Sequence, residues 1–301
     1  MTTINGKAAL VTGGGSGIGM GLAKELARRG ASVAIADINL ENARKVAGEI
    51  QAAGGAAAAF HCDVCERESI RALKDQANAV FGPILLVCAN AGATSFDALT
   101  DMSDDDVDWI IQVNLMGVMH TARTFLPEMM AAREGHVLAT ASMAGLVPGW
   151  IPTHAPYSAA KAGIIGLMMN LALELKAYNV HTTSYCPGGV ASNMKANNSL
   201  YRPARFGGPG SGEVHISEAS ANAKGMDFYT PESVAPMVLR AIENNRPFVF
   251  DHPEQRRVFM ETYSQVVEAC YDDCEAYARD VGGLVVNADG ARLPATTDNG
   301  R

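Results

Sequence analysis

Tyr157 and Lys161 are the residues of this sequence whose types and spacing most directly suggest acid–base chemistry. They lie in the apolar stretch APYSAAKAGIIGLMMNLALEL, which predicts a helix, and residues four apart stack on one helix face. A tyrosine alone has a pKa of about 10, too high for a base at neutral pH. A lysine ammonium one turn away favours the phenolate and lowers that pKa, so the pair could move a proton. The same spacing also arises by chance in packed helices, so the rest of the chain must supply the context.

A glycine-rich turn, VTGGGSGIG at residues 11–19, is the second motif with a chemical use. Its glycines permit a tight turn, let the backbone approach a pyrophosphate and let the following helix pack on its strand. The free N–H groups at the start of that helix favour a phosphate. A purely structural turn is the alternative, but the position between a first strand and a first helix favours a dinucleotide site. The residues predicted to bind the cofactor here are Gly13, Gly15, Ser16, Gly17, Ile18 and Gly19.

Asp37, at the end of the second predicted strand, bears on which dinucleotide is bound. A carboxylate at this point can accept hydrogen bonds from the adenosine ribose and would repel a 2′-phosphate. No Lys or Arg occurs at 14–16 or 38–40 to attract that phosphate. The sequence therefore favours NAD over NADP, with Asp37 and Ile38 beside the ribose; a charge at a helix N-terminus is the alternative role of Asp37.

Alternating strands and helices must position these residues. Apolar segments predict strands at 7–14, 32–37, 56–64, 84–92, 135–142 and 180–189, and helices are predicted at 17–29, 39–55, 66–81 and 155–177. A further long helical stretch ends near Ala132 and is expected to break before Val113 and Asn114. Strands that are apolar on both faces and alternate with helices predict an α/β fold, a Rossmann-type doubly wound parallel sheet in three α/β/α layers.

The alternation of predicted strands and helices stops after Gly189. Residues 191–229 are polar and rich in glycine and proline, and a long loop of this kind is usually a lid or a binding loop, so a substrate-binding lid is predicted at 190–230. A helix at 231–243, a short strand at 248–250 and a final helix at 253–279 follow. We therefore expect one Rossmann-fold domain over 1–301, with a C-terminal helical extension and a flexible tail at 252–301.

Composition excludes several classes of protein. The 301 residues are 48% hydrophobic and 19% charged, with a net charge of −8, which argues against nucleic acid and anionic membranes as partners. The sequence has neither a secretory signal nor an apolar run of roughly 18 residues, so a cytoplasmic location is expected. Cys62 and Cys65 form a C-x-x-C motif, and Cys270 and Cys274 lie one helical turn apart. Because a zinc site needs four ligands at workable spacing, no metal site is predicted and reduced thiols are expected.

Together these motifs resemble the short-chain dehydrogenase/reductase family over about residues 5–192. The matching positions are the cofactor turn from Thr12 to Gly19, the adenine pair Asp63 and Val64, the strand-end motif Asn90, Ala91 and Gly92, the tetrad Asn114, Ser142, Tyr157 and Lys161, and the nicotinamide stretch Pro187, Gly188, Val190 and Ser192. The resemblance implies a catalytic role for the tetrad and a cofactor-binding role for the other residues, with Tyr157 and Lys161 in both.

The resemblance also implies what each member of the tetrad does. Tyr157 exchanges a proton with the substrate oxygen, while Lys161 lowers the phenol's pKa and binds the nicotinamide ribose. Ser142 orients the substrate oxygen, and Asn114 holds a water that links Lys161 to solvent. The nicotinamide cofactor carries the hydride between an alcohol and its ketone.

The substrate contacts are expected at Ser142, Met143, Ala144, Trp150, Tyr157 and Gly189. The interval between Ser142 and Tyr157 is longer than is common in the family, and its segment GLVPGWIPTHAP should line the pocket. Trp150 is either a substrate wall or loop packing. His154 is interpreted as a solvated side chain rather than a second proton-transfer group, because Tyr157 already fills that role.

A long lid and an extended interval favour a bulky, partly apolar alcohol or ketone. The lid and tail resemble bacterial dehydrogenases that oxidise the benzylic Cα alcohol of lignin-derived β-aryl ethers; steroids, terpenols and diaryl carbinols are the alternatives. The family resemblance implies a homodimer or homotetramer, with the long C-terminal helix favouring the dimer. A non-catalytic NAD-binding sensor is the alternative from another class, and sugar epimerases with the same Tyr-x-x-x-Lys usually carry a larger C-terminal domain.

Overall fold

The computed structural model describes residues 1–94, 96–147, 152–192, 194, 200–209 and 228–281. The chain divides into two compact units, Met1–Pro253 and Glu254–Arg301. Among the helices of the described residues, none has the length and hydropathy of a membrane span.

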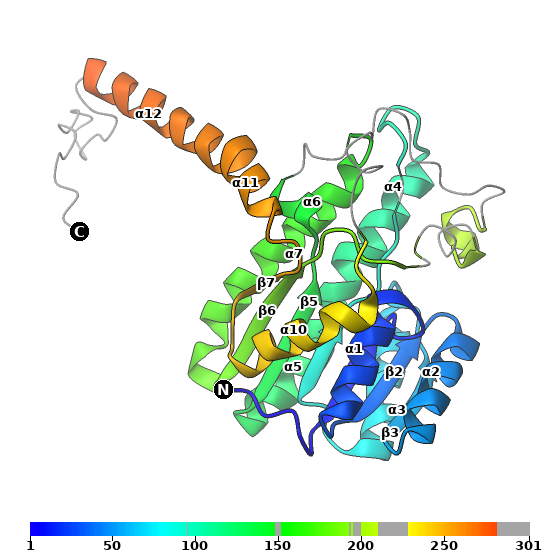
Figure 1. The fold of residues 1–301 in the computed structure, drawn as a ribbon. Coiled ribbons are helices and arrows are strands. Elements are labelled where there is room, and N and C mark those ends of the chain that lie inside the picture. Colours follow the sequence, from blue (N-terminus) through cyan, green and yellow to red (C-terminus); the bar gives the residue numbers. More distant parts are fainter. Residues whose placement is uncertain (95, 148–151, 193, 195–199, 210–227, 282–301) are drawn as a thin grey trace, which may run out of the picture. The chain divides into compact units, whose positions relative to one another are not determined.

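The first unit is built on a sheet of seven parallel strands in the order β3-β2-β1-β4-β5-β6-β7 (Figure 1). This confirms the predicted Rossmann-type fold. The order reverses direction between β1 and β4, and such a switch point is where parallel sheets of this kind bind ligands. The strands are β1 (Ala8–Thr12), β2 (Ser32–Asp37), β3 (Ala56–His61), β4 (Leu86–Ala89), β5 (Gly135–Thr140), β6 (Val180–Cys186) and β7 (Phe248–Phe250).

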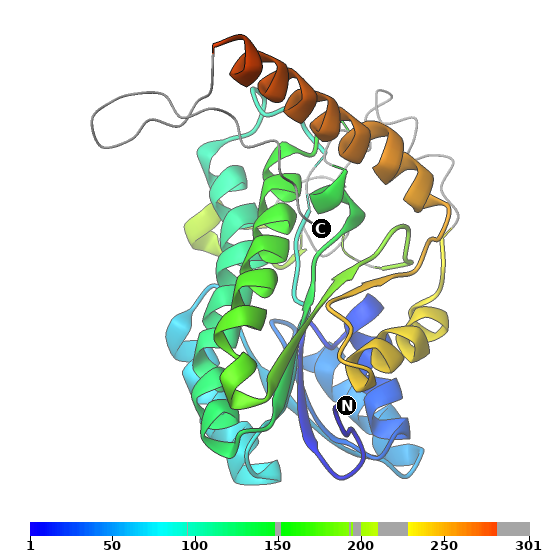
Figure 2. The same ribbon diagram turned by 90° about the vertical axis from the view of Figure 1, so that its left-hand side faces the viewer.

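Helices cover both faces of this sheet, as Figure 2 shows edge-on. One layer contains α1 (Gly17–Arg28), α2 (Leu40–Ala52) and α10 (Pro231–Glu243), and α1 packs against α10. The other layer contains α3 (Arg67–Phe81), α5 (Gly117–Ala132) and α7 (Ala155–Glu174). The short elements α6 (Met143–Leu146), η3 (Lys176–Tyr178) and η4 (Ala204–Phe206) lie in the connections.

Burial explains why these segments form these elements. Every residue of β1 and of β5 is buried, as expected for strands covered on both faces. On α3, by contrast, the buried residues Ile70, Leu73 and Ala77 are three and four positions apart and form a single apolar stripe. The largest core cluster lies between the sheet and the α1, α2 and α10 layer.

One predicted break is wrong. The helix from α4 (Asp104–Ile111) does not stop before Val113 but continues through a π-helical turn, η1 (Gln112–Met116), into α5. A π turn adds one residue to a helical turn without interrupting it, and it often marks a functional site. Several predicted strands, such as 84–92, also extended past the observed ends, because the apolar run continues into the loops that line the pocket described below.

The second unit contains the predicted C-terminal helix. It comprises α11 (Gln255–Phe259), a π-helical turn η6 (Met260–Ser264) and α12 (Gln265–Asp280). None of the residues of α12 is buried. The predicted flexible tail falls at residues 282–301, outside the described part of the chain, and most of the predicted lid is outside it as well.

Candidate active site

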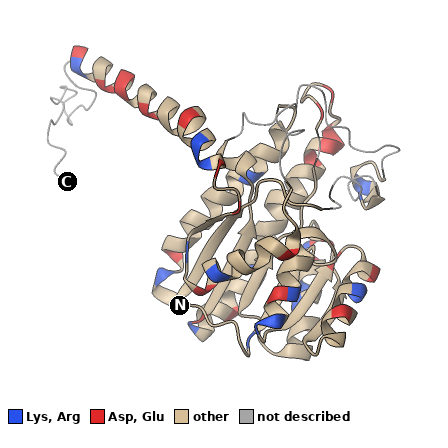
Figure 3. Cartoon of the chain, in the orientation of Figure 1, with Lys and Arg blue, Asp and Glu red and all other residues tan. Residues whose placement is uncertain are grey.

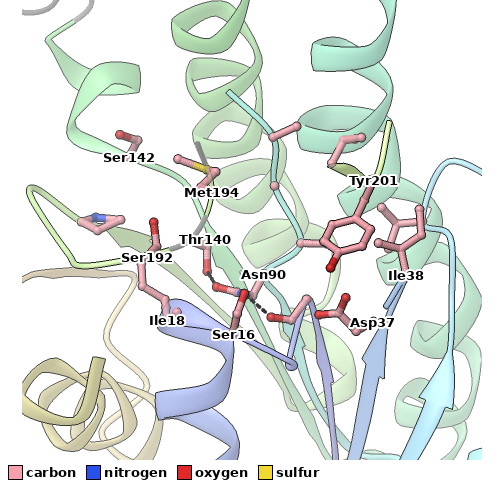
Figure 4. Close-up of a pocket in the computed structure, with 18 of the residues that line it drawn as sticks. Ser16, Ile18, Asp37, Ile38, Asn90, Thr140, Ser142, Ser192, Met194 and Tyr201 are labelled. Atoms are coloured by element: carbon pink, nitrogen blue, oxygen red, sulfur yellow. Dashed lines mark hydrogen bonds between the residues drawn. The ribbon is translucent and has the colours of Figure 1, made fainter. Parts of the chain in front are cut away.

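A pocket opens at the carboxyl ends of the strands, over the switch point between β1 and β4 (Figure 4). It brings together most of the residues that the sequence singled out. The predicted residues that line it are Gly13, Ser16, Gly17, Ile18, Asp37, Ile38, Asp63, Val64, Asn90, Ala91, Gly92, Ser142, Tyr157, Lys161, Pro187, Gly188, Val190 and Ser192.

The glycine turn lies in van der Waals contact with the neighbouring strand ends. A Cβ on Gly19 would lie 2.1 Å from the Gly13 carbonyl oxygen, so only glycine lets α1 start this close to β1. Asn90 ties the turn to the sheet: its backbone N–H donates to Thr12 Oγ1 at 3.0 Å, and its Oδ1 accepts from Thr140 Oγ1 at 2.9 Å. Asn90 therefore fixes the ends of β1, β4 and β5 relative to one another.

Asp37 is held by two backbone donors. Its Oδ2 accepts from the Gly15 N–H and its Oδ1 from the Asn39 N–H, both at 2.9 Å. Burial raises the pKa of this carboxyl, and the hydrogen bonds from Asn39 and Gly15 oppose that shift. The carboxylate is thus fixed in orientation at one end of the pocket, as Figure 4 shows.

Asp63 follows the end of β3. Its Oδ1 accepts from the Cys65 N–H at 2.9 Å, and its Oδ2 accepts from Arg205 Nη2 at 2.8 Å. The two thiols of the C-x-x-C motif flank it, and burial is the main cause that raises the pKa of Cys62 to about 11 and of Cys65 to about 12. These thiols are protonated at neutral pH, which disfavours nucleophilic or redox chemistry there.

Ser142, Tyr157 and Lys161 meet at the other end of the pocket. Ser142 follows β5 and caps the short helix α6, where its Oγ accepts from the Ala144 N–H at 3.1 Å. Tyr157 and Lys161 lie on α7, and Lys161 Nζ is 5.3 Å from the centre of the Tyr157 ring. Lys161 Nζ donates to the Thr140 carbonyl at 2.7 Å, which holds the ammonium beneath the pocket.

The expected lowering of the tyrosine pKa is wrong for this structure. Burial raises the pKa of Tyr157 to about 12, although a hydrogen bond with Ser142 opposes the shift. Burial also lowers the pKa of Lys161 to about 7. Both groups are almost completely enclosed, so desolvation disfavours their charged forms, the phenolate and the ammonium.

Asn114 lies on the π turn and is fully buried. Its Nδ2 donates to the carbonyls of Ala93 and Ile110 at 2.8 and 2.9 Å, and its Oδ1 accepts from the Ala93 N–H at 3.3 Å. The amide group therefore binds the loop after β4 to the helix, and the side chain does not line the pocket among the described residues.

His154 is not the solvated side chain that the sequence suggested, because only 5% of it is exposed. Its ring lies parallel to the Tyr157 ring at 4.2 Å and stacks on Phe96 at 4.5 Å on the other face. Its Nε2 lies 2.9 Å from Thr94 Oγ1. Burial, helped by the charge of Lys161, lowers the pKa of His154 to about 4, so the imidazole is neutral and holds the tyrosine ring in place.

The loop at 187–190 is fixed from below by Asp251, which sequence reasoning did not single out. Its carboxylate accepts from the Gly188 N–H at 2.8 Å and from the Tyr185 hydroxyl at 2.6 Å, and it lies 2.6 Å from His252 Nδ1. Asp251 directly follows β7, so the last strand of the sheet positions the pocket wall. An aspartate after a short strand was the only signal in the sequence.

Some predicted residues lie elsewhere. The predicted residues that are described but do not line the pocket are Gly15, Gly19, Met143, Ala144 and Gly189, and Trp150 falls outside the described residues. Sequence reasoning missed Cys62, Ala93, Trp109, Val113, Thr140, Met194 and Tyr201, which do line the pocket. The described part of the chain contains no group of three or more His, Cys, Asp or Glu placed to hold a metal.

Known proteins are similar to this chain in sequence and in fold. The family model of the short chain dehydrogenases matches residues 7–202. The C alpha-dehydrogenase of Sphingobium sp. (strain NBRC 103272 / SYK-6) is 32% identical over 271 residues, which cover 89% of this chain and 88% of that protein.

Two solved structures are similar over most of their length. One is a short-chain dehydrogenase/reductase from Burkholderia phymatum in complex with NAD, with a TM-score of 0.81 and 27% identity over 89% of this chain and 97% of that chain. The other is the apo form of LigO from Sphingobium sp. strain SYK-6, with a TM-score of 0.75 and 32% identity over 93% of this chain and 96% of that chain. The chain therefore belongs to the short-chain dehydrogenase family and is an oxidoreductase.

Proposed function

We propose that the protein interconverts a bulky, aryl-bearing secondary alcohol and its ketone, with NAD as the hydride carrier. The observation that carries the proposal is one pocket with Ser142, Tyr157 and Lys161 at one end and Asp37 with the glycine turn at the other. This places a proton-transfer group and a dinucleotide-type turn at the two ends of a single site.

The residues present fit a nicotinamide dinucleotide. The glycine turn and the amino end of α1 would hold the pyrophosphate, and Asp37 would accept from the adenosine ribose hydroxyls. Asp63 and Val64 would border the adenine, while the 187–190 loop, Ser192 and Lys161 would border the nicotinamide ribose and ring. When bound, this cofactor supplies hydride transfer, and the chain supplies binding, orientation and proton transfer.

The proton would pass through Tyr157. With its raised pKa, the phenol is protonated at neutral pH and is ready to donate to a ketone oxygen. In alcohol oxidation the phenolate must form first and accept the proton. Ser142, hydrogen-bonded to Tyr157, would orient the same substrate oxygen. Asn114 would position the loop that lines the pocket after β4 and would hold a water that links Lys161 to solvent.

NAD rather than NADP follows from Asp37. Its carboxylate is oriented by two backbone donors and would face a 2′-phosphate with a like charge. None of residues 14–16 and 38–40 is a Lys or Arg that could compensate.

A bulky substrate is favoured by apolar side chains on the pocket wall, namely Trp109, Val113 and Met194. The likeness to a protein named C alpha-dehydrogenase, over most of both chains, favours a benzylic alcohol of the β-aryl ether type. Steroids, terpenols and other bulky carbinols are the competing substrates. A homodimer or homotetramer in the cytoplasm completes the proposal, and light scattering would determine the assembly.

The test is NADH formation by the purified protein with a panel of secondary alcohols, each run with NAD and with NADP. The panel contains a β-aryl ether dimer with a benzylic hydroxyl, a steroid, a terpenol and a small aliphatic alcohol. Turnover of the aryl ether with NAD is expected. If only another bulky alcohol is turned over, that alcohol replaces the aryl ether as the proposed substrate. Tight NAD binding with no turnover of any alcohol would favour the non-catalytic sensor.

A further inference from the structure

Residues 200–209 are fastened at three separate points, to Asn39 in the loop after β2, to Asp63 in the loop after β3 and to Asp106 on α4. We propose that this segment, here called the adenosine clasp, closes the cofactor site over the adenosine half, with the Tyr201 ring against the bound adenosine. The proposal rests on the cofactor site proposed above. The clasp would set cofactor affinity and release without touching the reacting atoms.

The first point of attachment is Tyr201. Its ring lines the pocket together with Asp37 and Ile38, and Figure 4 shows it next to both. The Tyr201 hydroxyl accepts from Asn39 Nδ2 at 2.5 Å, and Asn39 Oδ1 in turn accepts from the first N–H groups of α2. The tyrosine is therefore anchored to the same loop that carries Asp37, and an aromatic ring there offers a face for a nucleoside to stack on.

The second point is Arg205 on η4. Its guanidinium pairs with Asp63 at 2.8 Å and with Glu66 at 3.1 Å, both on the loop after β3. Asp37 and Asp63 both line the pocket, at the ends of the neighbouring strands β2 and β3, so the clasp is attached to the loops after both strands. Arg205 is 40% exposed and Glu66 52%, which makes these contacts accessible to salt.

The third point is Arg202, which pairs with Asp106 and lies 5.7 Å from the Trp109 ring. Asp106 belongs to the capping box that starts α4, whose first turn is acidic and is coloured red on the ribbon of Figure 3. Trp109 lines the pocket and lies next to Arg202, so its fluorescence reports on the clasp.

The three contacts that hold the clasp can break and re-form. Each is made by a side chain on a short segment without a strand partner, whereas Tyr157 and Lys161 lie on a helix of 20 residues. Exposed ion pairs contribute little singly and are screened by salt. The clasp is thus attached to the rest of the site by contacts that can break and re-form without disturbing the sheet.

The experiment measures binding of ADP-ribose, which carries the adenosine and pyrophosphate without the nicotinamide, to the full chain. Arg205→Gln and Tyr201→Ala are compared with Arg71→Gln, which removes another surface arginine that is paired with a glutamate, Glu68 on α3, away from the pocket. Loss of the Arg205 contacts should weaken ADP-ribose binding about threefold to tenfold. NADH release, followed by stopped-flow fluorescence, should accelerate by the same factor.

Two further readouts separate the clasp from a general loss of structure. High salt should accelerate NADH release from the unaltered protein and should have less effect on Arg205→Gln, since its ion pairs are already absent. Tyr201→Phe, which keeps the ring and loses only the bond to Asn39, should retain more affinity than Tyr201→Ala.

The outcomes are distinct. Unchanged ADP-ribose affinity and release in both Arg205→Gln and Tyr201→Ala would overturn the clasp while leaving the cofactor site intact. Failure of the unaltered protein to bind ADP-ribose, with Asp37→Ala no different, would overturn the proposed cofactor site and the clasp with it. Weakening confined to the two clasp variants, with Arg71→Gln unaffected, is the result we expect.

Discussion

The two ends of the pocket are held in different ways. At the reacting end, Tyr157 and Lys161 lie on one long helix, Ser142 caps a turn, and Lys161 is bound to the Thr140 carbonyl. At the adenosine end, Asn39 in the loop that carries Asp37 bonds Tyr201, and Asp63 pairs with Arg205 of the same later segment. The three side chains of the reacting end are buried, whereas Arg205 at the adenosine end is 40% exposed and is held by ion pairs. Chemistry and cofactor release can therefore be altered separately.

The largest effect is expected from Tyr157→Phe. The variant keeps the ring and its stack on His154 but loses the proton that the reaction moves. Turnover should fall by about 10² to 10⁴, the usual contribution of general acid–base catalysis, while NAD affinity stays within about threefold. Steady-state kinetics and a binding titration measure the two quantities; turnover near the level of the unaltered enzyme would sink the assigned mechanism.

Next in size is Asp37→Ser, which acts on the other end. Loss of a charged hydrogen-bond acceptor should weaken NAD binding about tenfold to a hundredfold and reduce the discrimination against NADP. The expected signature is a raised KM for NAD with kcat little changed. An unchanged ratio of NAD to NADP efficiency would mean that Asp37 does not read the ribose.

The pH dependence distinguishes the two directions of the reaction. Since burial raises the pKa of Tyr157 to about 12, the phenolate needed for oxidation becomes more abundant as the pH rises through the alkaline range. Oxidation should accelerate with pH, and ketone reduction, which needs the protonated phenol, should not. Rates in both directions on one substrate provide the measurement. An acidic optimum for oxidation would contradict the role given to this tyrosine.

The smallest effect is expected at His154. His154→Phe keeps an aromatic face on Tyr157 and removes both ring nitrogens, Nε2 beside Thr94 Oγ1 and the buried Nδ1, which has no hydrogen-bond partner among the described residues. His154→Leu loses the stack, which contributes about 0.5–1.5 kcal/mol, and should lower kcat about threefold to tenfold with the KM for NAD unchanged. Equal kcat in the two variants would show that the ring stack does not position the tyrosine.

The sequence predicts the reacting end of the pocket better than the adenosine end. Tyr157, Lys161, Ser142 and the glycine turn follow from local spacing and from the alternation of strands and helices. The bounds predicted for β7 and α10 also agree with the structure, because the apolar pattern of each segment is short and sharply bounded. The π turn at Asn114 could not be predicted from the sequence, since one extra residue in a turn does not visibly change the apolar pattern of a helix.

Contacts between residues that are far apart in the sequence cannot be predicted from local residue spacing. Burial of His154 depends on Phe96, and Asp251 acts through Gly188, more than fifty residues away in each case. Tyr201 and Arg205 lie in a polar segment whose composition predicts only a loop. The direction of the Tyr157 pKa shift was missed for the same reason, because it depends on how completely the fold encloses two charges.

The most direct test of the central claim is NADH formation from a bulky benzylic secondary alcohol, measured with the unaltered protein and with Tyr157→Phe side by side. The account predicts NAD-dependent turnover that the substitution abolishes while NAD still binds. Equal turnover by both proteins, or NAD binding with no turnover of any secondary alcohol by the unaltered protein, would contradict it.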